Sequence, residues 1–172
     1  MQDIFFYKSF GKVRKLLKGK NLIKENTLPN VFFLVTEGIF RKAKDHQFEG
    51  DLTREIYVPG DIIFPAEALT EKKRTDYYIE SLANAEVITF SVDIWGKLDC
   101  QFTQQLFKIK LLKKEKLSSL FYLDVESRYQ LFLEYYGPFA NYIPLNIVAS
   151  YLNMNVSTLS RVRKKLAEKA IG

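Results

Sequence analysis

The hydrophobic pattern of this chain changes its period near residue 93, and this change restricts the possible folds more than any other feature. Before that point, short runs rich in β-branched and aromatic residues, such as residues 31–35 and 87–91, alternate with turn residues such as Pro59-Gly60-Asp61. After it, turn residues are almost absent until Gly137-Pro138, and apolar residues recur at helical spacing. The sequence therefore predicts an α+β protein with antiparallel strands first and helices afterwards.

Three segments follow from this pattern. Several short strands at this spacing predict a small antiparallel barrel or roll in residues 1–98, with a short helix at residues 10–17 before the strands. A long helix is expected over residues 99–123. Residues 124–172 are expected to form a helical domain. Asp124 should cap its first helix, because the carboxylate can accept hydrogen bonds from the free amides of the first turn.

The composition leaves few chemical functions open. The 172 residues contain one cysteine and one histidine, Cys100 and His46, which cannot supply an internal disulfide or a metal site drawing on several imidazoles and thiolates. We therefore predict no catalytic residue, no metal, no cofactor and no enzymatic activity. No apolar stretch approaches the ~20 residues of a membrane span, and the N-terminus lacks the pattern of a secretion signal. A cytoplasmic protein that does not bind membranes is expected.

The long helix carries an apolar stripe that predicts a second subunit. A small roll does not cover a helix of this length, so a partner helix from another copy is the simplest way to bury the stripe. The alternative is that the stripe packs entirely on its own chain. The predicted dimer-interface residues are Phe102, Leu106, Ile109, Leu112, Leu117 and Leu120.

Positive charge is concentrated at the C-terminal end. The formal net charge is +6, and residues 142–172 contain five basic residues and one acidic residue. This distribution favours an anionic partner. In the same segment, Pro144 suits the first turn of a helix. Asn153 suits the left-handed position that ends the helix, and Asn155 can cap the next one. Two short helices joined by a tight turn form the helix-turn-helix arrangement that many DNA-binding proteins use.

The second of these helices has two contrasting faces. Leu159, Val162 and Leu166 form one apolar stripe, and small hydroxyl and basic residues lie opposite it. The guanidinium of Arg161 can donate two hydrogen bonds to O6 and N7 of guanine, whereas the ammonium groups of lysines suit phosphates. The alternative is a basic face that is only solvated. The predicted DNA-binding residues are Asn155, Ser157, Thr158, Ser160, Arg161, Arg163, Lys164 and Lys165.

Several tracts resemble the Crp/Fnr family of bacterial transcription regulators. They are FYLDVESR at residues 121–128, residues 148–152 and 158–162 in the two helices, and residues 33–38 and 59–61 in the roll. The resemblance spans nearly the whole chain. It implies a cyclic-nucleotide-binding-like sensor domain, a β-roll of the cupin-like double-stranded β-helix type, at residues 1–98 and a helix-turn-helix DNA-binding domain at residues 124–172. It implies a homodimer whose recognition helices enter successive major grooves of a pseudo-palindromic site in double-stranded DNA, with RNA polymerase as a further partner.

The effector region departs from the family pattern for cAMP. Members that bind cAMP carry Gly-Glu-Leu after the Gly-Asp turn and Arg-Ser or Arg-Thr further on, and the ungapped positions here hold Phe64-Pro65-Ala66 and Thr75-Asp76. The resemblance therefore implies an unknown small-molecule effector rather than cAMP, or no effector. The candidate pocket residues are Phe64, Pro65, Glu67, Arg74, Thr75 and Tyr77, and core packing is the alternative role for the aromatic ones.

These observations lead to two functional hypotheses. The leading one is a dimeric, sequence-specific DNA-binding regulator with a two-state hinge near Leu123-Asp124. The alternative is a ligand-binding or protein-interaction roll that no longer binds DNA.

Overall fold

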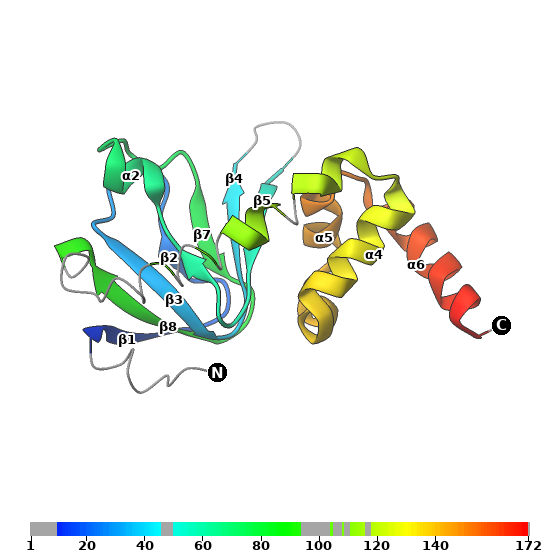
Figure 1. The fold of residues 1–172 in the computed structure, drawn as a ribbon, viewed down its shortest axis with the longest axis horizontal. Coiled ribbons are helices and arrows are strands. Elements are labelled where there is room, and N and C mark those ends of the chain that lie inside the picture. The colour runs from blue at the N-terminus through cyan, green and yellow to red at the C-terminus, as the bar shows by residue number, and fades with distance from the viewer. Residues whose placement is uncertain are drawn as a thin grey trace.

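Two four-stranded antiparallel sheets form the N-terminal part of the chain (Figure 1). The computed structural model describes residues 10–45, 50–93, 104, 108, 111–115 and 118–171. The first sheet has the order β1-β8-β3-β6 and the second the order β2-β7-β4-β5. The strands are β1 (Lys12–Leu16), β2 (Asn21–Ile23), β3 (Val31–Glu37), β4 (Phe40–Lys44), β5 (Leu52–Tyr57), β6 (Ile62–Ile63), β7 (Tyr78–Ser81) and β8 (Ala85–Ser91). A short helix, α2 (Ala66–Thr70), follows β6.

The roll closes around an apolar interior between the two sheets. Buried side chains from both sheets meet there, among them Phe33, Phe40 and Ile79. The turn between β3 and β4 depends on Gly38, which has φ +81, because a Cβ there would lie 2.5 Å from the Cβ of Ala85. The predicted α+β class with antiparallel sheets is therefore confirmed.

The prediction of a helix at residues 10–17 is wrong for most of that range. Residues Lys12–Leu16 form β1, which pairs antiparallel with β8 from Lys12 opposite Thr89 to Leu16 opposite Ala85. The spacing of Phe10, Val13 and Leu17 fits a helix equally well on periodicity alone. Pairing with β8 favours the strand over the helix, because it satisfies the backbone hydrogen-bonding groups on one side of β1.

The C-terminal part is helical. It contains η2 (Ser119–Tyr122), α4 (Val125–Tyr136), η3 (Gly137–Tyr142), α5 (Leu145–Tyr151) and α6 (Val156–Ile171), together called the C-terminal helical unit below. Asp124 caps α4 as predicted, since its Oδ1 accepts hydrogen bonds from the N–H groups of Glu126 at 2.9 Å and Ser127 at 3.1 Å. Gly137 ends α4, also as predicted.

The long helix predicted over residues 99–123 lies mostly outside the described residues. Within that stretch, residues 104, 108, 111–115 and 118 are helical. The chain then tightens into η2 before it reaches Asp124.

The roll and the C-terminal helical unit share one apolar core. Ile39, Ile56 and Val58 of the roll belong to the same buried cluster as Phe132 of α4 and Leu159 of α6. In Figure 1 the second sheet faces α4 and α5, and α6 lies on the side away from the roll. The domain boundaries predicted at residues 98 and 123 stay predictions, and residue 98 lies outside the described residues.

Within the described ranges, no helix has the length and apolar character needed to cross a bilayer. The same ranges contain no cluster of three or more metal-ligating side chains, and both His46 and Cys100 lie outside them.

Candidate nucleic-acid interface

A four-residue turn joins α5 to α6. Asn153 takes the left-handed conformation expected from the sequence, with φ 52. The N–H of Met154 donates to the carbonyl of Ala149 at 3.0 Å, and the N–H of Leu152 donates to that of Val148 at 2.9 Å. These bonds satisfy carbonyl groups at the end of α5 and set the direction in which α6 leaves.

Asn155 caps α6. Its Oδ1 accepts hydrogen bonds from the N–H of Thr158 and from the Oγ of Ser157, both at 2.7 Å. The cap predicted from the sequence is thus present. Two residues also predicted to contact DNA, Asn155 and Ser157, are engaged in this local capping arrangement.

The inner face of α6 is buried against α5 and α4. Leu159 and Val162 are buried in the shared core, and Leu166 packs against it. Val148 and Leu152 belong to the same cluster. Since this stripe is covered, the opposite face of α6 must point to solvent.

That outer face carries the basic and hydroxyl residues. Ser157, Ser160, Arg161 and Lys164 are all exposed. Among the described residues, Arg161 makes only long contacts, from Nε to the carbonyl of Ser157 at 3.4 Å and from Nη2 to Thr158 Oγ1 at 3.5 Å. Lys164 lies 3.9 Å from Glu168, at the limit of an ion pair. Within the part of the chain that the structure describes, neither cation therefore has a strong internal partner.

The remaining basic residues of α6 lie on its flanks. Arg163 borders a small cavity of about 30 Å³ that Tyr129 and Asn141 also line. Lys165 Nζ lies 2.5 Å from Glu126 Oε2 at the start of α4, and Lys169 Nζ bonds to Glu126 Oε1. The two lysines hold the pKa of Glu126 below its ordinary value, mainly through the hydrogen bond from Lys165. Lys165 therefore differs from Arg161 and Lys164 in having a strong internal partner.

Lys169 and Glu126 were not among the residues predicted from the sequence. The position of Lys169, one helical turn after Lys165, is a signal that the sequence does contain. Glu126 has no such signal, since it lies 39 residues before Lys165.

The C-terminal helical unit is fastened to the edge of the second sheet. Strand β5 is the last strand of that sheet, so one side of it has no strand partner. Ser150 Oγ of α5 accepts a hydrogen bond from the N–H of Thr53 at 2.9 Å and lies 3.3 Å from the carbonyl of Asp51. Further along, the carbonyl of Ile56 accepts from Tyr136 Oη at 3.3 Å.

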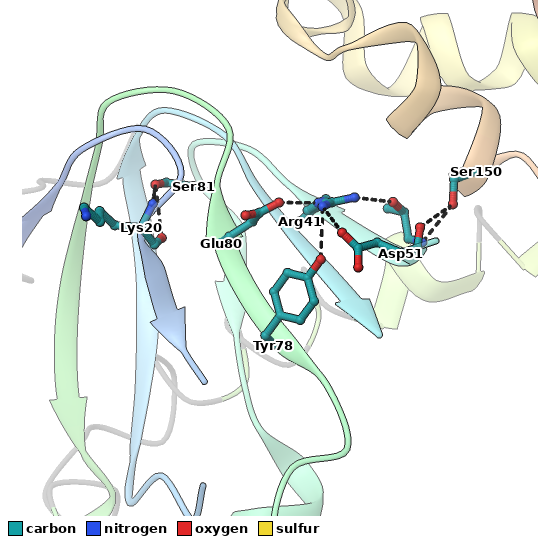
Figure 2. Close-up of polar contacts among 8 residues, drawn as sticks. Lys20, Arg41, Asp51, Tyr78, Glu80, Ser81 and Ser150 are labelled. Carbon is teal, nitrogen blue, oxygen red and sulfur yellow. Dashed lines mark hydrogen bonds and ion pairs between the residues drawn. The ribbon is translucent and has the colours of Figure 1, made fainter. Parts of the chain in front are cut away.

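Arg41 supports this edge from within the sheet. Figure 2 shows its guanidinium between Glu80 and Asp51, with the Tyr78 hydroxyl beside it and Ser150 on the far side of Asp51. The distances are 2.6 Å to Glu80 Oε1, 2.9 Å to Asp51 Oδ2 and 3.0 Å to Tyr78 Oη. The pKa of Arg41 is raised, because its carboxylate partners outweigh the opposing effect of burial. The segment that meets α5 is therefore held by an ionic network.

A buried ion pair joins the helical residues 111–115 to the same region. Lys113 Nζ lies 2.5 Å from Asp61 Oδ2 and 2.6 Å from the carbonyl of Ile56. Asp61 also accepts a hydrogen bond from the N–H of Val58 at 2.8 Å. Burial raises the pKa of Asp61 even though Lys113 opposes that shift. Lys113 from the helical residues 111–115 and Tyr136 from α4 thus meet the roll at the carbonyl of Ile56.

A groove of about 840 Å³ separates the end of the β4–β5 hairpin from the turn between α5 and α6. Its walls include Arg41 and Asp51 on the roll side and Asn146, Asn153 and Asn155 on the helical side.

The six candidate effector residues do not converge on one pocket. Arg74 Nη1 donates to the carbonyl of Asn26 at 2.8 Å, and the hydroxyl of the buried Thr75 donates to that of Lys24 at 3.0 Å. Both residues therefore fasten the loop between β2 and β3. Phe64 packs beside Phe32, with ring centroids 6.2 Å apart.

The other three lie around α2. Pro65 immediately precedes α2, and Glu67 in its first turn lies 3.9 Å from Lys42 Nζ. The same Lys42 Nζ lies 3.6 Å from the ring centroid of Tyr77, which is buried. The structure therefore brings Glu67 and Tyr77 together through Lys42, a residue that the sequence did not single out.

The six candidate dimer-interface residues have different environments. Phe102, Leu106, Ile109 and Leu117 lie outside the described residues. Leu112 is 54% exposed in the single chain, as a dimer contact requires. Leu120 is 3% exposed and belongs to the core shared with α4, α5 and α6, so the expectation for Leu120 is corrected: its own chain already covers it.

The fold is that of regulators with a cyclic-nucleotide-binding-like roll followed by helices. FixK2 from Bradyrhizobium japonicum has a TM-score of 0.72 at 16% identity, covering 94% of this chain and 86% of its own. CLP, a c-di-GMP-responsive global regulator from Xanthomonas campestris, has a TM-score of 0.67 at 14% identity, with coverage of 96% and 90%. A cyclic nucleotide-binding domain containing protein from Listeria monocytogenes has a TM-score of 0.74 at 12% identity, with coverage of 95% and 85%.

No protein-family model matches the sequence, and no curated protein matches it. FixK2 and CLP are Crp/Fnr-type transcription regulators. At such low identity the likeness concerns the fold alone.

Proposed function

We propose that this chain is a sequence-specific DNA-binding transcription regulator of the Crp/Fnr type that acts as a homodimer. The observation that carries the proposal is the outer face of α6. Arg161 and Lys164 are exposed beside Ser157 and Ser160, while the opposite face of the helix is buried. A helix with small and basic residues on its free face can enter a major groove, where small side chains permit close approach.

The proposed roles of the basic residues differ. Arg161 reads base edges, because a guanidinium can form two hydrogen bonds with guanine. Lys164 contacts phosphate and fixes register. Arg163 and Lys165, on the two flanks of α6, lie where a duplex backbone would pass if the outer face entered the groove.

The proposed dimer uses the long helix. Leu111 and Leu112 are both largely exposed in the single chain, and burying them against a second copy removes apolar surface from water. A two-fold dimer presents two α6 helices to a pseudo-palindromic site with half-sites one helical turn apart. The protein would then work in the bacterial cytoplasm, with RNA polymerase as a further partner.

The roll is proposed not to bind cAMP. Arg74 is engaged with the β2–β3 loop, and Tyr77 with Lys42 fills the space beside Glu67. Asp76 pairs with Lys44 at 2.8 Å and with Arg54 at 3.3 Å, so these two cations already have a carboxylate partner. An effector of another class, if one acts, would change how the C-terminal helical unit sits on β5.

Selection of bound fragments from random duplex DNA tests the proposal. We expect recovered sites with two-fold symmetry and half-site centres about 10 base pairs apart. Sedimentation of the protein with a selected site should give two chains per duplex. If no fragment is enriched, and no duplex binds even at low salt, the roll is instead a ligand-binding or protein-interaction module.

A further inference from the structure

Two lysines of α6 converge on one carboxylate of α4. Lys165 Nζ bonds to Glu126 Oε2 at 2.5 Å, and Lys169 Nζ bonds to Glu126 Oε1. The two lysines are one helical turn apart, so both ammonium groups reach the same side of α6. Each oxygen of the carboxylate therefore holds one cation of the helix that presents Arg161 and Lys164.

The three side chains differ in exposure. Lys165 and Lys169 are 60% and 58% exposed, whereas Glu126 is 19% exposed. The ammonium groups can therefore reach a second anion in solution while the carboxylate stays in place between the helices. Ion pairs with this much exposure are weak, because water and salt compete with them.

We infer that Glu126 is an intramolecular competitor of DNA phosphate for Lys165 and Lys169. This inference rests on the proposed function above. A phosphate and a carboxylate accept the same kind of charge-assisted hydrogen bond from an ammonium group. Glu126 therefore lowers the affinity for every duplex and reduces its salt dependence, without changing which bases are preferred.

Its place at the start of α4 suits this role. Asp124 already caps that helix through the N–H groups of Glu126 and Ser127, so the Glu126 side chain is not needed for capping. Its charge faces α6, where it pairs with Lys165 and Lys169. The Glu126 side chain thus sets how strongly the flank of α6 attracts the DNA backbone.

The test is E126Q, which keeps the shape of the side chain and removes its charge. Binding to a mixed-sequence duplex, measured by fluorescence anisotropy over a salt series, should strengthen about tenfold at low salt. The slope of log K against log salt should steepen by about 0.9 for each lysine that gains a phosphate. The matched control is E134Q, which removes an exposed charge two turns further along α4 and should leave both quantities unchanged.

A second pair of variants makes the result specific. In a K165Q/K169Q background, E126Q should produce no gain, because the lysines it would release are absent. A gain that persists there would mean that Glu126 acts by general repulsion, and it would overturn the inference. An unchanged or weaker affinity for E126Q, with thermal unfolding like that of the wild type, would overturn it equally. Failure of the wild type itself to bind any duplex at low salt would instead remove the proposed function.

Discussion

The hydroxyl of Ser150 in α5 accepts a hydrogen bond from the backbone N–H of Thr53 at 2.9 Å, across 97 residues of sequence. This contact joins the first helix of the α5–α6 pair to the edge strand of the second sheet. The Tyr136 hydroxyl makes a second such contact with the carbonyl of Ile56. Movement of α4 and α5 together relative to the roll must break these bonds, so a signal in the roll can reach α6 through β5 as well as through the hinge predicted at Leu123-Asp124.

Replacing Ser150 by alanine should weaken the contact between α5 and β5. The N–H of Thr53 would lose its partner at a partly buried site, which costs about 1–3 kcal/mol of unfolding free energy. Urea unfolding measures the change. S160A is the matched control, because Ser160 is exposed on the outer face of α6, and it should change stability by less than about 0.5 kcal/mol. Equal stability of the two variants would mean that the hydrogen bond between Ser150 and Thr53 contributes little to the unfolding free energy.

The cap of α4 gives a pH-dependent prediction. The pKa of Asp124 lies below its ordinary value of 3.8, mainly because the Ser127 hydroxyl donates to its carboxylate. A lowered pKa in the folded state means that the charge of Asp124 stabilises the fold above pH 3.8, and that this contribution is lost as the pH falls through the lower, folded-state value. D124N keeps a capping oxygen and removes the charge.

The melting temperature of D124N should therefore lie below that of the wild type at pH 6. The difference should shrink as the pH falls below 3.8, where the wild-type carboxyl also becomes neutral. Thermal unfolding followed by circular dichroism at several pH values measures both effects. A difference that stayed constant over this range would show that the charge of Asp124 is not what stabilises the cap.

Replacing one partner of the Lys113–Asp61 ion pair should lower the unfolding free energy strongly. Replacing both partners should lower it much less. Both side chains are buried, and K113M leaves the Asp61 carboxylate without its cation, which costs about 3–5 kcal/mol. The Asp61 carboxyl would respond by taking a proton, since burial already raises its pKa. The double variant K113M/D61N should recover most of the loss. Urea unfolding of the single and double variants measures these free energies. If the loss in the double variant equalled the sum of the losses in the single variants, the two residues would not be coupled.

Local signals in the sequence explain which features could be foreseen. Asp124 and Asn155 cap α4 and α6 as expected, because a cap needs only neighbouring residues. Asn153 ends its helix for the same reason. The strand at Lys12–Leu16 could not be told from a helix, because its identity depends on β8, which lies about 70 residues further along the chain.

Contacts between distant segments had no local signal. Nothing around Ser150 indicates that it meets β5, and nothing around Glu126 indicates that it meets Lys165. The helical spacing that placed Leu120 in a dimer stripe could not reveal that η2 turns this side chain into the shared core. Periodicity indicates that a residue is buried and leaves open which surface buries it.

The proposed dimer can be tested at Leu112. L112E places a charge on a leucine that is 54% exposed in the single chain, so the isolated fold should tolerate it. In a dimer the same charge would be buried without a partner, which is strongly unfavourable. Sedimentation should therefore show single chains for L112E and pairs for the wild type. The matched control is L17E on the roll, where Leu17 is 66% exposed and the pair should persist.

The outer face of α6 gives the sharpest prediction about recognition. R161A should reduce the preference for a selected site over random DNA by about 1–3 kcal/mol, because Arg161 is proposed to read a base. K164A should weaken binding to both kinds of DNA by similar factors and lower the salt slope by about 0.9, because Lys164 is proposed to meet phosphate. Fluorescence anisotropy with the two duplexes separates these effects. If the two variants lost specific and random binding equally, the assignment of base and phosphate contacts would be wrong.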